Sequence, residues 1–176
     1  MIYIRSRKLY LYSMTLLLTL ACLFFPMKGF ADESNITELT ILHTNDIHAS
    51  IDDFGKVAYY INEEREKASH FLYLDAGDFA SGNPVVDLND GKPLVEIFNL
   101  VELDAMTIGN HEFDYGQEAF QVNTVDSEFP WLAANMDVGQ SGIAQTKPYE
   151  LFDLDGLTVG VFFRSHKLLL QQLQLI

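Results

Sequence analysis

The fold of this chain is decided by the stretch Leu39-Thr40-Ile41-Leu42-His43-Thr44-Asn45-Asp46-Ile47-His48, in which a polar cluster directly follows a short apolar run. The same layout recurs at Phe71-Leu72-Tyr73-Leu74-Asp75-Ala76-Gly77-Asp78 and at Asp104-Ala105-Met106-Thr107-Ile108-Gly109-Asn110-His111-Glu112. Each apolar run is rich in β-branched or aromatic residues and too short for a typical helix. The runs therefore predict three buried strands, over residues 39–43, 71–75 and 104–108.

The polar clusters are evenly spaced along the chain. Asp46 and Asp78 are 32 residues apart, and so are Asp78 and Asn110. This interval matches one strand-helix-strand unit of about 30 residues and predicts an α/β fold. In α/β sheets the carboxyl ends of the strands lie along one edge, where ligands bind. The residues expected to meet at that edge are Asp46, His48, Asp78, Asn110 and His111.

The residue types in these clusters indicate a metal site. Carboxylate, imidazole and amide oxygen together favour zinc, manganese, iron or a similar metal over a soft thiolate site. Asp78 lies between the other clusters and can bridge two ions at roughly 3.5 to 4 Å, as in sites that clamp both oxygens of a phosphoryl displacement. Two divalent ions would outweigh the charges of Asp46 and Asp78, so the site would attract a phosphate dianion.

Three motifs in this sequence resemble those of one known family. They are Leu42-His43-Thr44-Asn45-Asp46-Ile47-His48-Ala49, Asp75-Ala76-Gly77-Asp78 and Ile108-Gly109-Asn110-His111-Glu112-Phe113-Asp114. They are similar to the first three blocks of the calcineurin-like metallophosphoesterases, and the third looks most like the secreted 5′-nucleotidase and 2′,3′-cyclic phosphodiesterase branch. The resemblance covers residues 39–162, the amino-terminal part of the family's domain. It implies a metallophosphatase sandwich, two β-sheets flanked by helices, here truncated.

The resemblance also implies roles for individual residues. Asp46 and His48 would bind the first ion, Asp78 would bridge, and Asn110 would bind the second ion. His111 is similar to the family's catalytic histidine, and Asp114 to the carboxylate that orients its imidazole. The implied activity is metal-dependent hydrolysis of phosphoric esters in nucleotide catabolism, of the 5′-nucleotidase type, with two ions of zinc, manganese or a similar metal and a metal-activated water.

Each assignment has a structural alternative. Asp46 or Asp78 alone could be an ordinary helix N-cap after a strand. His43 lies within a predicted strand and is interpreted as a core histidine, Glu112 as a loop carboxylate without a ligand role, and Thr44 as a turn former. Residues assigned to loops, structure or solvent and left outside the site are Asn45, Asn135, His70 and His166.

Residues 1–31 are predicted to be a signal peptide. Basic residues precede an apolar stretch over 9–25, and Gly29-Phe30-Ala31 offers small residues at the positions that a signal peptidase reads. The expected location is periplasmic, cell-envelope or extracellular. An uncleaved membrane anchor is the alternative, whereas the apolar residues after Cys22 argue against a lipoprotein. Cleavage would remove Cys22, the single cysteine of the chain, so the stability of the mature chain would come from its core rather than from disulfides.

The chain is strongly acidic, with a formal net charge of −14. Such a charge argues against general binding to nucleic-acid polymers or anionic membranes, and no stable membrane association is expected after cleavage. It does not exclude a nucleotide or another small phosphate ester, because bound metal would set the local field. The sequence leaves the oligomeric state open.

The segments between the motifs predict ordinary elements. Residues 55–67 and 92–101 carry apolar residues at helical spacing and are expected to form crossover helices. Residues 149–162 are expected to form a hairpin that turns at Asp155-Gly156, since Asp-Gly tolerates the positive φ angles of a tight turn.

The tail over residues 163–176 differs from the predicted domain over residues 32–162, because the tail lacks Gly, Pro, Asp and Glu. It is interpreted as foreign sequence after a frame change or premature stop, with an amphipathic carboxyl-terminal helix as the alternative. The family's later metal-binding histidines are absent, so the chain would carry only half of the site. The alternative function is therefore a catalytically inactive fragment or a metal-binding remnant.

Overall fold

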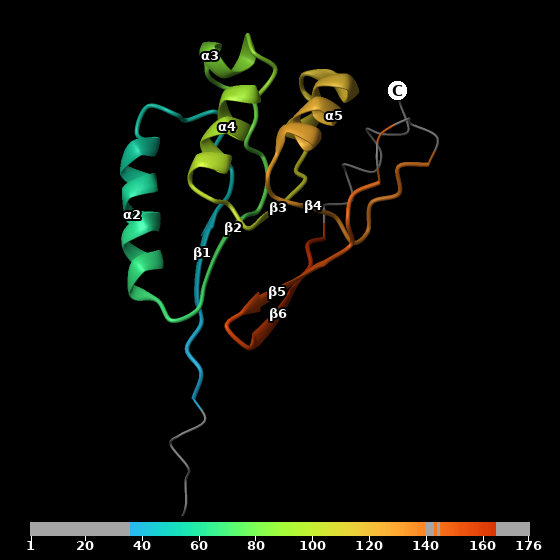
Figure 1. The fold of residues 1–176 in the computed structure, drawn as a ribbon. Helices are drawn as coiled ribbons and strands as arrows, with labels where there is room; N and C mark the ends of the chain where they lie inside the picture. Colours follow the sequence, from blue (N-terminus) through green and yellow to red (C-terminus); the bar gives the residue numbers. More distant parts are fainter. Residues whose placement is uncertain (1–35, 140–142, 144, 165–176) are drawn as a thin grey trace, which may run out of the picture. The chain divides into compact units, whose positions relative to one another are not determined.

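A computed structural model describes residues 36–139, 143 and 145–164. Its main sheet contains β1 (Thr40–Thr44), β2 (Phe71–Asp75), β3 (Ala105–Thr107) and β4 (Trp131–Leu132), side by side in that order. All three neighbouring pairs are parallel, and Figure 1 shows the strands in this sequence across the sheet. The predicted α/β fold with strands in these three places is confirmed.

Helices connect each strand of the main sheet to the next. They are α2 (Phe54–Lys67), α3 (Pro84–Asp87), α4 (Lys92–Leu100), the 3-10 helix η2 (His111–Phe113) and α5 (Gly116–Asp126). In α2, Phe54 and Ile61 are buried, while Lys67 forms exposed ion pairs with Glu63 and Glu64. The α2 and α4 helices confirm the crossover helices expected from the sequence to within one residue at each end.

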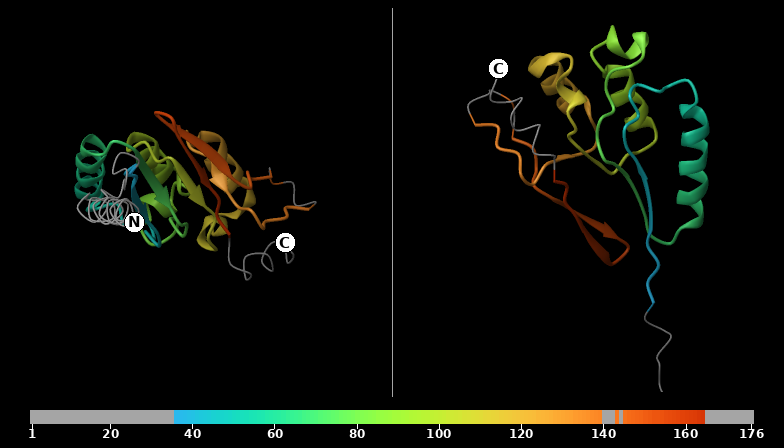
Figure 2. Two further views of the ribbon diagram at one scale, coloured as in Figure 1. Left: turned by 90° about the horizontal axis from the view of Figure 1, so that it is seen from below. Right: turned by 180° about the vertical axis from the view of Figure 1, so that it is seen from behind.

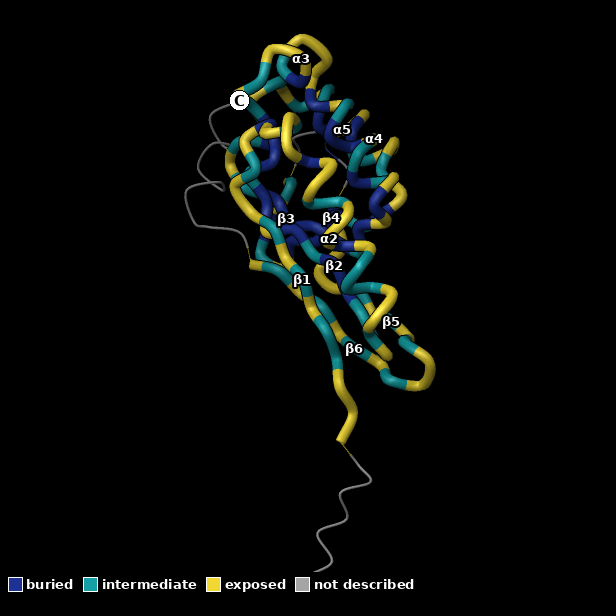
Figure 3. The backbone as a smooth tube through the Cα atoms, turned by 90° about the vertical axis from the view of Figure 1, so that its left-hand side faces the viewer, coloured by how far each residue is buried: buried dark blue, intermediate teal, exposed yellow. Residues whose placement is uncertain are grey.

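Aromatic side chains form the centre of the core. Trp131 lies 5.6 Å from Phe79 and 5.4 Å from Phe120, measured between ring centroids. Phe98 packs 6.0 Å from Phe129 in an edge-to-face arrangement, a geometry that the ring quadrupole favours. All five side chains are buried, and Figure 3 shows how burial concentrates on the main sheet and the helices beside it.

The first strand is less buried than predicted. β2 and β3 are largely buried, but β1 alternates between intermediate and exposed residues. The interpretation of His43 as a core histidine is wrong, because its side chain lies on the exposed set of this alternation. β1 pairs only with β2 among the described residues, so it forms an edge of the main sheet. Thr44 is also not a turn former, since it is the last residue of β1.

The predicted hairpin is present. β5 (Glu150–Leu154) and β6 (Leu157–Val161) pair antiparallel as a second, two-stranded sheet, seen from two further sides in Figure 2. Its turn is Asp155-Gly156, with φ angles of 51° and 92°. Along both strands intermediate and exposed residues alternate. The backbone N–H of Ala134 donates to the carbonyl of Phe163 at 2.8 Å, which connects the segment after β6 to the segment after β4.

Two predictions fall on other parts of the chain. The signal peptide over residues 1–31 lies outside the described residues, and so does the tail from residue 165 onward. Within the described part of the chain, every helix is too short or too polar to cross a membrane.

Candidate functional site

The loops after β1, β2 and β3 come together through backbone hydrogen bonds. The N–H of Asp46 donates to the carbonyl of Gly77 at 2.9 Å, and the N–H of His48 donates to the carbonyl of Asp78 at 3.2 Å. The third loop joins them where the N–H of His111 donates to the Asp78 carboxylate, at 3.0 Å from Oδ1. These hydrogen bonds join the loops that carry Asp46, His48, Asp78 and His111.

These loops depend on unusual backbone angles. Asp46, His48, Ala49, Asp78 and Ser81 all have positive φ, between 46° and 60°. For residues with a Cβ this left-handed region costs roughly 1 to 2 kcal/mol each. Such strain persists only where the surrounding structure determines the backbone, and it gathers at functional sites. The first two loops therefore combine local strain with hydrogen bonds that compensate for it.

Two glycines allow the second and third loops to approach each other. A Cβ on Gly77 would lie 2.7 Å from the backbone nitrogen of Gly109. A Cβ on Gly109 would lie 2.2 Å from Oδ1 of Asp78 and 2.7 Å from the Asp78 backbone nitrogen. No side chain fits in either place, so these glycines bring the carboxylate of Asp78 against the start of the third loop.

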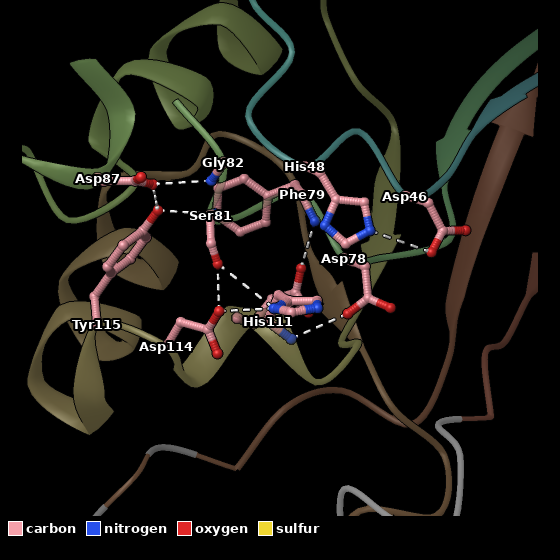
Figure 4. A network of polar contacts seen from close by, with 11 residues as sticks. Asp46, His48, Asp78, Phe79, Ser81, Gly82, Asp87, His111, Asp114 and Tyr115 are labelled. Carbon is pink, nitrogen blue, oxygen red and sulfur yellow. Dashed lines mark hydrogen bonds and ion pairs between the residues drawn. The ribbon is translucent and has the colours of Figure 1, made fainter. Parts of the chain in front are cut away.

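Three candidate side chains make two close contacts, both through His48 (Figure 4). Nε2 of His48 lies 3.8 Å from Oδ1 of Asp46, and both side chains are accessible to solvent. The imidazoles of His48 and His111 meet edge to face, with 4.8 Å between ring centroids. Asp46, His48 and His111 thus border one accessible region.

Asp114 holds the imidazole of His111. Nδ1 of His111 lies 2.7 Å from Oδ2 of Asp114, within hydrogen-bond distance. This hydrogen bond raises the pKa of His111 above its ordinary value, against the opposing effect of partial burial. With Nδ1 engaged, Nε2 is the ring nitrogen left for other partners.

The position of Glu112 differs from the loop carboxylate expected from the sequence, because this residue is buried in η2. Its side chain is only 3% exposed, and Oε1 accepts the backbone N–H of Phe79 at 2.9 Å. Burial raises its pKa to about 8. The bonds from Phe79 to Glu112 and from His111 to Asp78 run in opposite directions, so each of these two loops supplies a carboxylate to a backbone N–H of the other. The absence of a ligand role for Glu112 stays a prediction.

Asp75 is a further buried carboxyl group that the sequence reasoning missed. It is fully buried at the end of β2, where it accepts hydrogen bonds from the Thr44 hydroxyl at 2.6 Å and the Gly77 N–H at 2.9 Å. Burial raises its pKa to about 6. The neighbouring phenol of Tyr73 has its pKa raised to about 12, also by burial. The available signal was an Asp as the last residue of a buried strand.

The helix-cap alternative does not fit the structure. α2 begins after Asp53 and α3 begins after Asn83, so neither Asp46 nor Asp78 precedes a helix. Asn135 lies beyond β4, which ends at Leu132.

Comparison with known proteins identifies the family. The model of the calcineurin-like phosphoesterases matches residues 39–172. This chain belongs to that family. The match contains all three loops of the site.

Several relatives of this calcineurin-like phosphoesterase are nucleotide-directed enzymes by name. A trifunctional nucleotide phosphoesterase of Bacillus subtilis (strain 168) is 35% identical, over 76% of this chain and 12% of that protein. A 5′-nucleotidase of Vibrio vulnificus (strain CMCP6) is 32% identical, over 85% of this chain and 29% of that protein. The solved structure of the NAD nucleotidase of Haemophilus influenzae has a TM-score of 0.68 and 28% identity, over 73% of this chain and 26% of its own. The chain spans less than a third of the length of these three proteins.

The donor set suits the divalent metals that calcineurin-like phosphoesterases use. Asp46 and Asp78 offer carboxylate oxygens and His48 an imidazole, a mixture typical of zinc or manganese sites. The side chain of Asn110 makes no capping hydrogen bond to η2, so its amide oxygen is not used there. Within residues 36–139, 143 and 145–164, no group of three or more His, Cys, Asp and Glu is placed to hold an ion. The donors suit such an ion by their chemistry. In their described positions Asp46 and His48 lie together as a pair, and they do not form a complete coordination shell.

Proposed function

We propose that this calcineurin-like phosphoesterase hydrolyses phosphate esters of nucleotides by a metal-dependent reaction of the 5′-nucleotidase type. The observation that carries the proposal is the meeting of the Asp46–His48 pair, Asp78 and the His111–Asp114 pair at one sheet edge. The names of the Bacillus and Vibrio relatives support a nucleotide phosphate as the substrate class.

The proposed metal ligands come from all three loops. Asp46 and His48 would hold one ion, Asn110 would hold a second, and Asp78 would be a ligand to both. Bound metal would supply an activated water as nucleophile and neutralise charge on the phosphate. The chain's own contribution is to hold these donors, which the strained loops and the glycine contacts at 77 and 109 do before any ligand arrives.

His111 and Asp114 have the proposed catalytic role. Oδ2 of Asp114 accepts a hydrogen bond from Nδ1–H of His111, so the imidazole is oriented with Nε2 free. Nε2 can then donate a proton or hydrogen bond to a phosphate oxygen as the ester bond breaks. Since Asp114 raises the pKa of His111, the proton that this step needs is held more firmly on the imidazole.

Only part of each metal shell is assigned. The first ion would have three protein ligands and the second only Asp78 and Asn110, whereas zinc and its neighbours take about four ligands, of which catalytic sites leave one to water. We therefore propose that this chain supplies about half of the two-metal centre. The rival proposal, a metal-binding remnant with a single ion, follows from the same ligand count.

Metal content separates the two proposals. The 176-residue chain should be compared with a chimera in which residues 39–162 are joined to the carboxyl-terminal part of the Vibrio vulnificus 5′-nucleotidase. Elemental analysis after loading with manganese should find near two ions per chimera and at most one per short chain. One ion or none in a folded chimera would support the remnant.

Export is proposed together with this activity. Cleavage after Ala31 would release an acidic chain outside the cytoplasm, where it would meet nucleotides rather than bind nucleic-acid polymers. Intact mass of the exported protein checks the cleavage. A product that still begins at Met1, or that carries a lipid on Cys22, would contradict it.

A further inference from the structure

Residues 81–82 form a tightly constrained turn beside the His111–Asp114 pair. Ser81 has a φ of 60° and Gly82 a φ of 135°. A Cβ on Gly82 would lie 2.6 Å from the carbonyl oxygen of His48, so this turn packs directly against the first loop. A serine in the left-handed region of such a turn needs specific partners to keep it there.

A ring of hydrogen bonds supplies those partners. The backbone N–H of Ser81 donates to the Tyr115 hydroxyl at 2.8 Å, and that hydroxyl donates to Oδ1 of Asp87 at 2.6 Å. Oδ1 of Asp87 also accepts the N–H of Gly82 at 3.2 Å. The ring therefore closes on the turn itself (Figure 4). Burial and the bond to Asp87 raise the pKa of the Tyr115 phenol, which keeps the donating proton in place.

The turn aims the side chain of Ser81 at the catalytic pair. The Ser81 hydroxyl donates to Oδ2 of Asp114, the same oxygen that lies 2.7 Å from Nδ1 of His111. Oγ of Ser81 also lies 3.5 Å from Nδ1 of His111. Asp114 is consequently fixed by two donors that converge on one oxygen.

We propose that Ser81 is a positioning residue that orients Asp114 and, through it, the imidazole of His111, with the Tyr115–Asp87 pair holding Ser81 in place. The inference rests on the proposed function for its catalytic meaning. Asp114 and Tyr115 are consecutive in the chain, and they bind the side chain and the backbone N–H of Ser81 respectively. One short segment therefore holds both the side chain and the backbone of Ser81.

The need for a second donor follows from exposure. The side chain of Asp114 is 38% exposed, so water competes for its oxygens and its rotamer is not set by packing. The hydrogen bond from Ser81 to Oδ2 restricts the rotation of the Asp114 carboxylate. The imidazole of His111, which contacts the same oxygen, is therefore held in a narrower range of orientations. A fixed partner on Nδ1 also selects the tautomer with its proton on that nitrogen.

The test is the tautomer of neutral His111, measured in the metal-free 176-residue chain by long-range proton–nitrogen NMR at alkaline pH. His111→Asn assigns the signal among the five histidines. The wild type should hold the proton mainly on Nδ1. Ser81→Ala should lower the ratio of the Nδ1–H to the Nε2–H tautomer by about threefold or more, because Asp114 loses its second donor.

Further variants separate orientation from folding. Ser81→Gly removes the same hydroxyl and suits the positive φ, so it decides the question even if the alanine variant unfolds. Tyr115→Phe should lower the ratio in the same direction through the backbone of Ser81. The matched controls are Ser69→Ala, and Tyr59→Phe at a tyrosine that is 68% exposed on α2; both should keep the wild-type ratio.

A wild-type tautomer ratio in folded Ser81→Ala or Ser81→Gly would overturn the proposal. A wild-type ratio in folded Tyr115→Phe would overturn the part assigned to Tyr115 and Asp87. The tautomer ratio is measured without hydrolysis. An inactive protein would therefore contradict the proposed function, while the tautomer ratio of His111 would still decide this inference.

Discussion

The site loops and the β5–β6 hairpin make turns of opposite kinds. The hairpin reverses at Asp155-Gly156, where the positive φ angles fall on a sequence suited to them and the pairing strands are adjacent in the chain. The site loops place positive φ on Asp46, His48 and Asp78, and their hydrogen bonds join residues about 30 apart. The hairpin is therefore a local solution, whereas the site exists only when the whole sheet edge has formed.

This difference has a consequence for substitutions. A change in the hairpin turn should alter stability alone, because the nearest partners of the turn are its own strands. A change in the site loops should alter metal content or turnover as well. A site variant can therefore be compared with a matched hairpin variant. Turnover and metal content are measured on the chimera with the Vibrio vulnificus relative.

Asp78→Asn should have the largest effect. One carboxylate serves both proposed ions, so hydrolysis should fall below detection and the metal content should drop. Phosphate release and elemental analysis measure the two losses. The hairpin control is Asp155→Asn, since Asn also tolerates the left-handed φ of 51° at that position. Normal metal content in Asp78→Asn would remove Asp78 from the ligand set.

His111→Asn should lower turnover by about a hundredfold or more, the usual contribution of an acid-base group. Its metal content should stay near the wild-type value, since His111 is proposed to act on the substrate. Steady-state kinetics with metal analysis on the same sample tests both expectations. If this variant lost metal as fully as Asp78→Asn, His111 would be a ligand.

Asp75 should make stability depend on pH. Its folded pKa of about 6 is raised above the ordinary 3.8, so the contribution of the neutral carboxyl is fully present below about pH 4 and is lost as the pH rises through 6. The loss is at most about 3 kcal/mol. Denaturant unfolding of the metal-free chain at pH 4 and pH 7 measures it.

Asp75→Asn should remove this loss. The amide can accept the Gly77 N–H and donate to the Thr44 hydroxyl, so the variant keeps the hydrogen bonds without a charge. Asp153→Asn, at an exposed position of β5, should keep the wild-type difference between the two pH values. The same pH difference in Asp75→Asn as in the wild type would assign the effect to another group.

Gly109→Ala and Gly156→Ala should be the smallest pair of effects. The new Cβ at position 109 would lie 2.2 Å from Oδ1 of Asp78, and overpacking of this kind costs about 1 to 3 kcal/mol. At position 156 nothing lies within 4 Å and only the φ of 92° is strained, at about 1 to 2 kcal/mol. Thermal unfolding compares the costs. Only Gly109→Ala should lose metal, and equal metal content in both would contradict the site geometry.

The sequence predicted what depends on periodicity and spacing. The strand positions, the crossover helices α2 and α4 and the Asp155-Gly156 turn follow from local patterns. It failed where the outcome depends on packing from elsewhere. His43 is exposed because the described residues leave its face of β1 uncovered, and Glu112 is buried where it accepts a backbone N–H of the second loop.

The site was partly predictable for the same reason. Equal spacing and polar strand ends predicted that the candidate ligands meet at one edge of the sheet. The contact of Ser81 with Asp114 could not be predicted, since it depends on a left-handed turn and on the Tyr115–Asp87 bond between separate loops. Likewise, the pKa of Asp75 depends on burial that no single strand encodes.

Phosphate release from AMP by the chimera tests the central claim most directly. With manganese added, the account predicts turnover on the order of 10 per second, abolished both by a chelator and by Asp78→Asn. The carboxyl-terminal part alone should release no phosphate. A folded chimera that binds two ions without releasing phosphate, or one whose activity survives Asp78→Asn, would contradict the claim that these strand ends form a phosphoesterase centre.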